Sequence, residues 1–120
     1  MKLKTLAFLT ISVLSTSLWA DYSGHYTCET VHRGKEIKPQ LDLSVKGNTY
    51  HEILKWEDQT RERDLIATSD PTIFLSYWEY VRTVGVSSWH FKDSSVTQDR
   101  IFFDKKDGKK YMEQSVCKKT

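Results

Sequence analysis

Apolar and polar residues alternate along most of the chain after residue 20, and short turn signals interrupt the alternation. The stretch Leu41–Lys46 (LDLSVK) alternates strictly, as a strand with one buried face does. Eight strand-like segments follow one another at a spacing of roughly 8–12 residues, which is typical of an all-β sandwich or barrel. They are Tyr22–Val31, Leu41–Lys46, Thr49–Glu57, Leu65–Ser69, Thr72–Val81, Val84–Lys92, Arg100–Asp104 and Tyr111–Cys117.

No segment after residue 20 keeps a sustained 3.6-residue apolar period, and only Asp58–Asp64 is compatible with a single helical turn. Eight antiparallel strands joined by short loops can close into an up-and-down barrel, because closure leaves no sheet edge unpaired. We therefore predict a single eight-stranded antiparallel barrel over residues 21–120, with a two-sheet β-sandwich as the alternative.

Gly47-Asn48 is a candidate two-residue hairpin loop, and a glycine in the first central position suits a type II′ turn. Such a loop pairs Leu43 with Glu52 and places this carboxylate on an apolar face. A carboxylate inside a small barrel requires a partner or a ligand. A bulge that shifts the register, or a place at a wet barrel mouth, would remove that requirement. The apolar face comprises Leu41, Leu43, Val45, Tyr50, Leu54 and Trp56.

The first 20 residues have the features of an export signal. Lys2 and Lys4 precede the apolar run Leu6–Leu14, and the segment ends in Ala20. The run is shorter than the roughly 20 residues of a membrane-spanning helix. We expect cleavage before Asp21, with an uncleaved N-terminal anchor as the alternative. Residues 1–20 would then be the signal peptide, and the exported domain would be periplasmic or secreted with no integral membrane segment.

The exported domain carries no net charge. Removing residues 1–20 takes away two lysines and no acids, which leaves 16 basic and 16 acidic residues. Nucleic-acid-binding domains show a clear basic excess, so we expect no nucleic-acid partner, and we expect a monomer. The lysines from Lys105 to Lys110 are interspersed with Asp104 and Asp107, a pattern that indicates a solvated hairpin tip, with an anionic-ligand patch as the alternative.

The only two cysteines, Cys28 and Cys117, lie near the two ends of the exported domain. An even cysteine number in an oxidising compartment favours a disulfide. Barrel closure would also place the first and last strands side by side, so the disulfide and the topology support each other. Two free buried thiols are the alternative.

Known catalytic and metal-binding patterns are missing from the sequence. There is no phosphate-binding glycine loop, zinc-ligand spacing or nucleophile elbow. The four histidines share no short ligand spacing, although His25 and His51 lie on strands that could be neighbours. A Ser-His-Asp triad is recognised by geometry and not by spacing. We therefore assign no catalytic residue, no metal and no cofactor, and do not expect an enzyme.

Aromatic residues are abundant, with 13 in the exported domain. In the run Tyr77–Tyr80, Trp78 and Tyr80 share one face of a strand and Tyr77 lies on the other. Aromatic side chains are enriched where partners dock. The candidate ligand-binding residues are Glu52, Trp56, Trp78, Tyr80 and Trp89.

Two short motifs carry a resemblance to known families. Gly24-His25-Tyr26 resembles the Gly-x-Trp start of lipocalin-like and avidin-like barrels, with Tyr in place of Trp. Tyr26-Thr27-Cys28 together with Cys117 resembles small exported bacterial barrels, among them inhibitors of C-type lysozyme. The inhibitory loop of that family has a Ser-x-Ser-Gly-x-x-Tyr pattern, and Ser87-Ser88-Trp89 departs from it. The resemblance implies an exported barrel and transfers no functional residue.

Two functions are consistent with these features. The first is a small binding protein of lipocalin-like design that takes an apolar or aromatic ligand. The second is a protein-interaction module, such as a secreted inhibitor or a host-directed factor, that uses exposed aromatics and the lysine-rich tip. The first requires an open pocket of about 300 Å³ or more.

Overall fold

A computed structural model describes residues 21–120, and the expected export segment at residues 1–20 lies outside the described residues. The described part is all-β: ten strands follow one another without an intervening helix. Accordingly, no helix in residues 21–120 is long and apolar enough to cross a membrane. The strands are β1 (Gly24–His32), β2 (Lys35–Ile37), β3 (Gln40–Lys46), β4 (Thr49–Trp56), β5 (Gln59–Asp64), β6 (Ile66–Ala67), β7 (Ile73–Glu79), β8 (Thr83–Lys92), β9 (Ser95–Asp104) and β10 (Lys109–Lys119).

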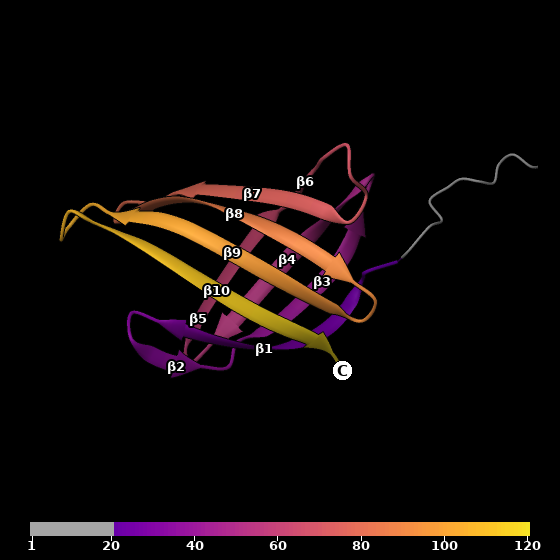
Figure 1. The fold of residues 1–120 in the computed structure, drawn as a ribbon, viewed down its shortest axis with the longest axis horizontal. Helices are drawn as coiled ribbons and strands as arrows, with labels where there is room; N and C mark the ends of the chain where they lie inside the picture. The colour runs from indigo at the N-terminus through magenta and orange to yellow at the C-terminus, as the bar shows by residue number, and fades with distance from the viewer. Residues whose placement is uncertain (1–20) are drawn as a thin grey trace, which may run out of the picture.

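The strands form one antiparallel sheet in the order β5-β4-β3-β1-β10-β9-β8-β7-β6, and β2 adds a short hairpin to β1. Figure 1 shows β7 to β10 crossing in front of β3 to β5 at a steep angle, so the sheet wraps around on itself. This confirms the antiparallel barrel, with β1 beside β10. The wall contains nine strands, one more than predicted.

The chain itself joins the two ends of this sheet. β5 pairs with β4, β6 pairs with β7, and the N–H of Leu65 between them donates to the carbonyl of Tyr50 at 2.8 Å. Beyond this junction, the free edge of β5 has no strand partner in the described residues. We call the interval between Gln59–Arg63 of β5 and Ser76–Glu79 of β7 the seam. No backbone hydrogen bonds join the two strands across it.

The predicted helical turn at Asp58–Asp64 is wrong, because this segment forms β5. Arg61 and Arg63 are half-buried, whereas Glu62 and Asp64 are exposed. The residues thus alternate with the period of two that a strand requires. Because charged arginines occupy the inward positions, the segment lacks the apolar alternation from which strands are inferred.

The predicted hairpin register is confirmed: Leu43 pairs with Glu52, and Lys46 pairs with Thr49 across the two-residue loop. Gly47 has a φ of 61°, which agrees with the first central position of a type II′ turn. Glu52 consequently lies inside the barrel and is fully buried. Val45 departs from the predicted buried face, since it is exposed near the end of the hairpin.

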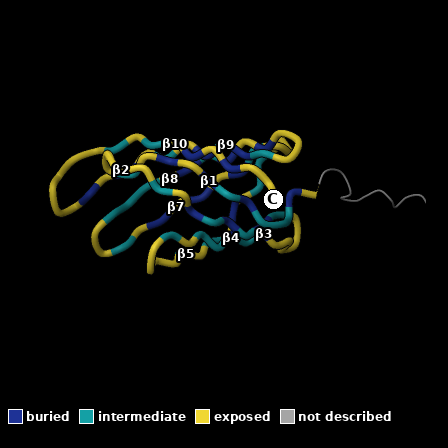
Figure 2. The backbone as a smooth tube through the Cα atoms, turned by 90° about the horizontal axis from the view of Figure 1, so that it is seen from below, coloured by how far each residue is buried: buried dark blue, intermediate teal, exposed yellow. Residues whose placement is uncertain are grey.

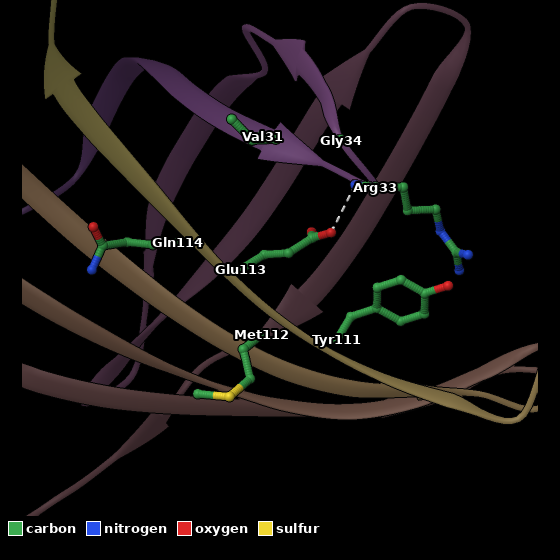
Figure 3. A pocket seen from close by; sticks show the side chains of 7 residues that line it. All are labelled: Val31, Arg33, Gly34, Tyr111, Met112, Glu113 and Gln114. Atoms are coloured by element: carbon green, nitrogen blue, oxygen red, sulfur yellow. Dashed lines mark hydrogen bonds between the residues drawn. The ribbon is translucent and has the colours of Figure 1, made fainter.

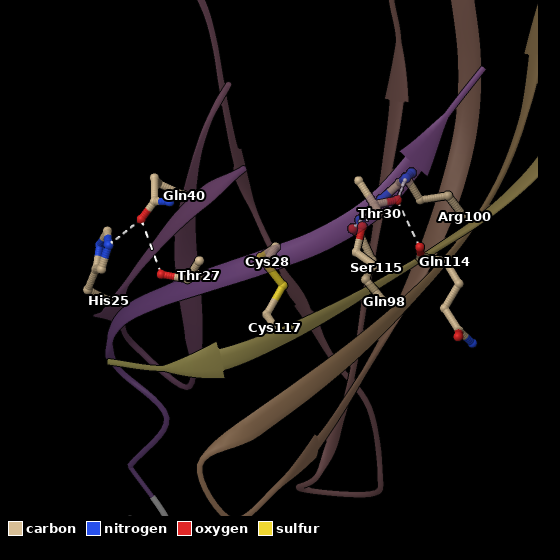
Figure 4. Close-up of a disulfide and its surroundings, with 10 residues drawn as sticks. All are labelled: His25, Thr27, Cys28, Thr30, Gln40, Gln98, Arg100, Gln114, Ser115 and Cys117. Atoms are coloured by element: carbon tan, nitrogen blue, oxygen red, sulfur yellow. Dashed lines mark hydrogen bonds between the residues drawn. A yellow bond between two sulfur atoms is a disulfide. The ribbon is translucent and has the colours of Figure 1, made fainter. Parts of the chain in front are cut away.

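The hydrophobic core fills one end of the barrel. Its centre includes a stacked pair of rings, Tyr22 and Phe91, whose centroids lie 4.3 Å apart. The predicted disulfide between Cys28 and Cys117 is confirmed, and both residues belong to this core (Figure 4). Figure 2 shows the buried positions along the strands and the exposed positions at the turns. The buried core cluster comprises Tyr22, Tyr26, Cys28, Leu41, Leu43, Tyr50, Leu65, Phe74, Trp89, Phe91, Val96 and Cys117.

Candidate functional site: an arginine-lined cavity

The other end of the barrel is hollow and contains a cavity of about 1030 Å³. Its wall is built from β1, β2, β4, β5, β7, β9 and the start of β8, together with the β1–β2 and β7–β8 turns. Lysine is the commoner basic residue of this chain, yet no lysine of residues 21–120 lines the cavity. All five arginines of the chain line it instead: Arg33, Arg61, Arg63, Arg82 and Arg100.

Aromatic and aliphatic side chains form the apolar part of the wall, chiefly Trp56, Trp78, Phe102 and Leu54. Trp78 can lie against the sheet because the residue paired with it on β8 is Gly85. A Cβ atom at position 85 would lie 2.5 Å from Cζ2 of Trp78 and 2.6 Å from Cβ of Phe102. The missing side chain therefore shapes this wall of the cavity.

Arg100 forms the floor between the cavity and the core. One terminal nitrogen donates to Gln98 Oε1 (2.8 Å) and Ser115 Oγ (2.6 Å). The other donates to Thr30 Oγ1 (3.0 Å) and Glu113 Oε1 (3.1 Å). Figure 4 shows Arg100 with Thr30, Gln98 and Ser115 beyond the disulfide, toward the far end of β1. The guanidinium is 12% exposed and well supplied with acceptors, so its role is to hold the floor together.

Glu113 is the second anchor of the floor. His32 Nδ1 lies 2.9 Å from Oε1, and the backbone N–H of Arg33 donates to Oε2 at 2.9 Å. Burial by itself raises the pKa of Glu113, but the hydrogen bonds from His32, Arg33 and Arg100 outweigh it and lower the pKa to about 2. The carboxylate therefore stays ionised at neutral pH.

Asp104 holds two arginines at the rim. Its Oδ2 accepts hydrogen bonds from Arg33 at 2.5 Å and Arg82 at 3.0 Å, and its side chain is fully buried. Oδ1 accepts the backbone N–H groups of Lys106 and Asp107. Burial raises the pKa of Asp104, yet these hydrogen bonds dominate and the net pKa is well below its usual range.

Glu52 lies beneath the cavity wall and is paired with Arg63, whose Nε donates to Oε1 at 2.7 Å. The other carboxylate oxygen, Oε2, is buried without a hydrogen-bond partner in the described structure. Burial raises the pKa of Glu52, and the positive charges of Arg63 and Arg100 offset this only in part. The Glu52–Arg63 pair is thus the least completely satisfied polar contact around the cavity.

Arg61 differs from the other four arginines because it makes no ion pair within residues 21–120. Its guanidinium carbon lies 5.5 Å from the ring centroid of Trp56 and 5.0 Å from that of Tyr80. Its closest side-chain acceptor, Gln59 Oε1, is 3.5 Å away. Stacking leaves the N–H edge of a guanidinium free to donate to another group.

Three of the five candidate ligand-binding residues, Trp56, Trp78 and Tyr80, line the cavity. Glu52 lies just behind its wall, in contact with Arg63. Trp89 lies elsewhere: it is buried in the core, and its indole N–H donates to Ser76 Oγ at 3.1 Å. Apolar patterning in the sequence does not detect the arginines of the cavity. The alternation of Arg61 and Arg63 with Glu62 and Asp64 is nevertheless a usable signal for a strand.

The histidines give no metal centre. Within residues 21–120, no group of three or more His, Cys, Asp or Glu side chains is arranged to hold a metal ion. His25 binds Asp42 and Gln40, whereas His51 binds Asp64 and Glu62, so the two form separate clusters. These contacts, led by the hydrogen bonds to Asp42 and Asp64, raise the pKa of each histidine.

A smaller depression of about 460 Å³ lies between the β1–β2 turn and β10. Figure 3 shows Glu113 reaching the backbone of Arg33 there, with Met112 directed away. Val31 and Met112, which line it, are 50% and 79% exposed. This depression is therefore an open surface, whereas the arginine-lined cavity is recessed between strands.

No protein-family model matches this chain, and no curated protein matches its sequence.

Proposed function

We propose that the protein is an exported binding protein of lipocalin-like design that holds a small ligand in the arginine-lined cavity. The observation that carries the proposal is the cavity itself. Its volume of about 1030 Å³ lies at the upper end of the range of roughly 300–1,000 Å³ of small-molecule sites. Such sites also combine apolar walls with a few fixed polar groups, as this wall of Trp, Phe and Arg side chains does.

Two further features support the proposal. At the level of the cavity, the seam between β5 and β7 is closed by side-chain contacts and not by backbone pairing, so this wall can rearrange to admit a ligand. The disulfide is consistent with export to an oxidising compartment, where such bonds persist.

The test is binding of N-phenyl-1-naphthylamine, a neutral fluorophore that brightens in apolar surroundings. We expect binding to the unmodified protein and its loss in Leu54→Trp, which fills the cavity from β4. Ile53→Trp adds the same side chain to the neighbouring residue, which does not line the cavity, and should leave binding intact. Binding that persists in Leu54→Trp would contradict the proposal, as would an unmodified protein that binds neither this probe nor its sulfonated analogue, 8-anilinonaphthalene-1-sulfonate.

A second candidate function is docking of a partner protein on the outside of the barrel. Tyr77, Val86, Ile101 and Met112 are paired in register across β7 to β10. They are 69%, 47%, 49% and 79% exposed, which makes a continuous apolar row. Exposed apolar patches commonly mark interaction surfaces. Tyr77 is the aromatic residue of the set, as the hypothesis of exposed aromatics requires.

Substitution at the centre of this row separates the two functions. Ile101→Lys should abolish capture of a protein partner by the outer face and leave fluorophore binding in the cavity unchanged. Leu54→Trp should have the opposite pattern. If Ile101→Lys captures the same proteins as the unmodified chain, the apolar row is not the docking surface.

A further inference from the structure

We propose that the cavity selects an anion, a carboxylate, sulfonate or phosphate monoester joined to an apolar or aromatic body, and that Arg61 is the residue that binds the anionic group. The inference rests on the proposed function, because it names the class of ligand for the same cavity. Its evidence is the distribution of charge among the residues that line the cavity and those that support it.

Most of the arginines that line the cavity are paired with carboxylates. Four arginines are matched by four carboxylates: Glu52 pairs with Arg63, Glu113 with Arg100, and Asp104 with both Arg33 and Arg82. The fourth carboxylate is Asp107, whose Oδ2 lies 3.8 Å from Arg33. Arg61 is the one arginine of residues 21–120 that is left without an ion pair.

The acidic residues near Arg61 do not neutralise it. Glu62 and Glu79 line the cavity, but each carboxylate is directed to another basic side chain. Glu62 Oε1 lies 3.0 Å from His51 Nε2, and Glu79 Oε2 lies 3.8 Å from Lys105 Nζ. Both are also largely exposed, at 58% and 73%, so water screens their charge.

Arg61 is held in position before any ligand binds. Its side chain extends from β5 across the seam, with Trp56 on its own side and Tyr80 on the β7–β8 turn. Contact with two rings fixes the guanidinium while leaving its N–H groups available. A guanidinium binds a carboxylate or phosphate through two parallel hydrogen bonds, and prior fixing reduces the entropy lost on binding.

The cavity wall also contains a surface that suits the apolar body of the ligand. Trp78 and Phe102 lie on the same side of the cavity, with ring centroids 6.3 Å apart. They give an apolar surface beside Arg61. The combination fits an amphipathic anion better than an inorganic ion, which has no apolar part.

Two fluorophores with the same ring system test this inference. 8-Anilinonaphthalene-1-sulfonate carries a sulfonate that N-phenyl-1-naphthylamine lacks. We expect the sulfonate to bind the unmodified protein about tenfold more tightly or better, as a charge-assisted hydrogen-bond pair implies. Arg61→Gln should remove this preference by lowering the affinity for the sulfonate far more than the affinity for the neutral probe. Lys92→Gln removes the same charge from a residue that does not line the cavity and is the matched control.

The results distinguish selection for anions from ligand binding in the cavity. Equal binding of both probes, or an unchanged sulfonate affinity in Arg61→Gln, overturns the selection for anions while the cavity remains a binding site. Failure of both probes to bind, or binding that survives Leu54→Trp, overturns the proposed function itself. Arg61→Lys keeps the charge and should retain part of the preference. It also keeps the test decisive if Arg61→Gln loses its native circular dichroism.

Discussion

The guanidinium carbon of Arg63 lies 4.7 Å from the ring centroid of Trp78, across an interval where their strands share no backbone hydrogen bonds. Arg61 and Tyr80 make the equivalent contact one pair further along, at 5.0 Å. The seam is therefore closed by arginine–aromatic contacts instead of a strand ladder. Side chains can rearrange at lower free-energy cost than a paired strand. The seam is therefore the part of the cavity wall that changes shape most readily.

Arg63→Gln tests the buried ion pair at the seam. The substitution leaves Glu52 buried without its cation, and breaking such a pair costs about 3 kcal/mol of unfolding free energy. Urea denaturation gives the value. The double variant Glu52→Gln/Arg63→Gln also removes the unpaired carboxylate and should recover more than half of the lost unfolding free energy. A single variant that is as stable as the unmodified protein would show that the pair contributes little.

Gly85→Ala tests the packing of Trp78. The new methyl group would lie within 3 Å of Trp78 Cζ2, Phe102 Cβ and the carbonyl oxygen of Ile101. We expect a loss of about 1–3 kcal/mol from overpacking and a changed near-ultraviolet circular dichroism signal from the tryptophan. Gly108→Ala is the control, because position 108 has open space and only a positive φ of 73° to oppose the substitution. An unaltered signal in Gly85→Ala would contradict the assigned packing.

The sequence supported those features that depend on local pairing. The turn Gly47-Asn48 sets the register that places Glu52 inside the barrel, and this register is the one observed. The two cysteines likewise indicate the pairing of the first and last strands. Both inferences need only the period of a strand and the geometry of a short loop.

The cavity was less accessible to sequence reasoning. Trp78 and Trp89 both point inward, but one lines the cavity and the other fills the core. Their difference depends on how the strands are staggered around the barrel, which no local pattern reveals. Arg61 and Arg63 occupy inward positions that apolar periodicity does not detect. Ion pairing and stacking after folding, with Glu52, Trp56 and Trp78, make these positions tolerable.

Removal of the disulfide should destabilise the whole domain. Cys28 and Cys117 are 89 residues apart, and closing such a loop stabilises by about 4–5 kcal/mol in the chain-entropy model. Reduction with dithiothreitol should therefore lower the urea midpoint strongly, and Cys28→Ala/Cys117→Ala should behave similarly. Reduced and oxidised protein with the same midpoint would show that the unfolded chain gains little from opening this loop.

The floor of the cavity should be sensitive to acid. The pKa of Glu113 is lowered to about 2 from 4.5, so the folded state binds the proton less readily than the unfolded state. Its contribution to stability is therefore full above pH 4.5 and is lost as the pH falls toward 2. Urea unfolding at several pH values should show this decline, and Glu113→Gln should flatten it. A variant with the same acid dependence as the unmodified protein would assign the effect to other carboxylates.

The most direct test of ligand binding in the cavity is the indole region of a ¹H–¹⁵N spectrum during titration with 8-anilinonaphthalene-1-sulfonate. Trp56 and Trp78 line the cavity, whereas Trp89 is buried in the core at the other end of the barrel. Trp→Phe variants assign the signals, including that of Trp19 in the expected export segment. We predict saturable shifts of Trp56 and Trp78 with Trp89 unchanged. No shift of Trp56 or Trp78 at saturation, or a shift confined to Trp89, would contradict binding in the arginine-lined cavity.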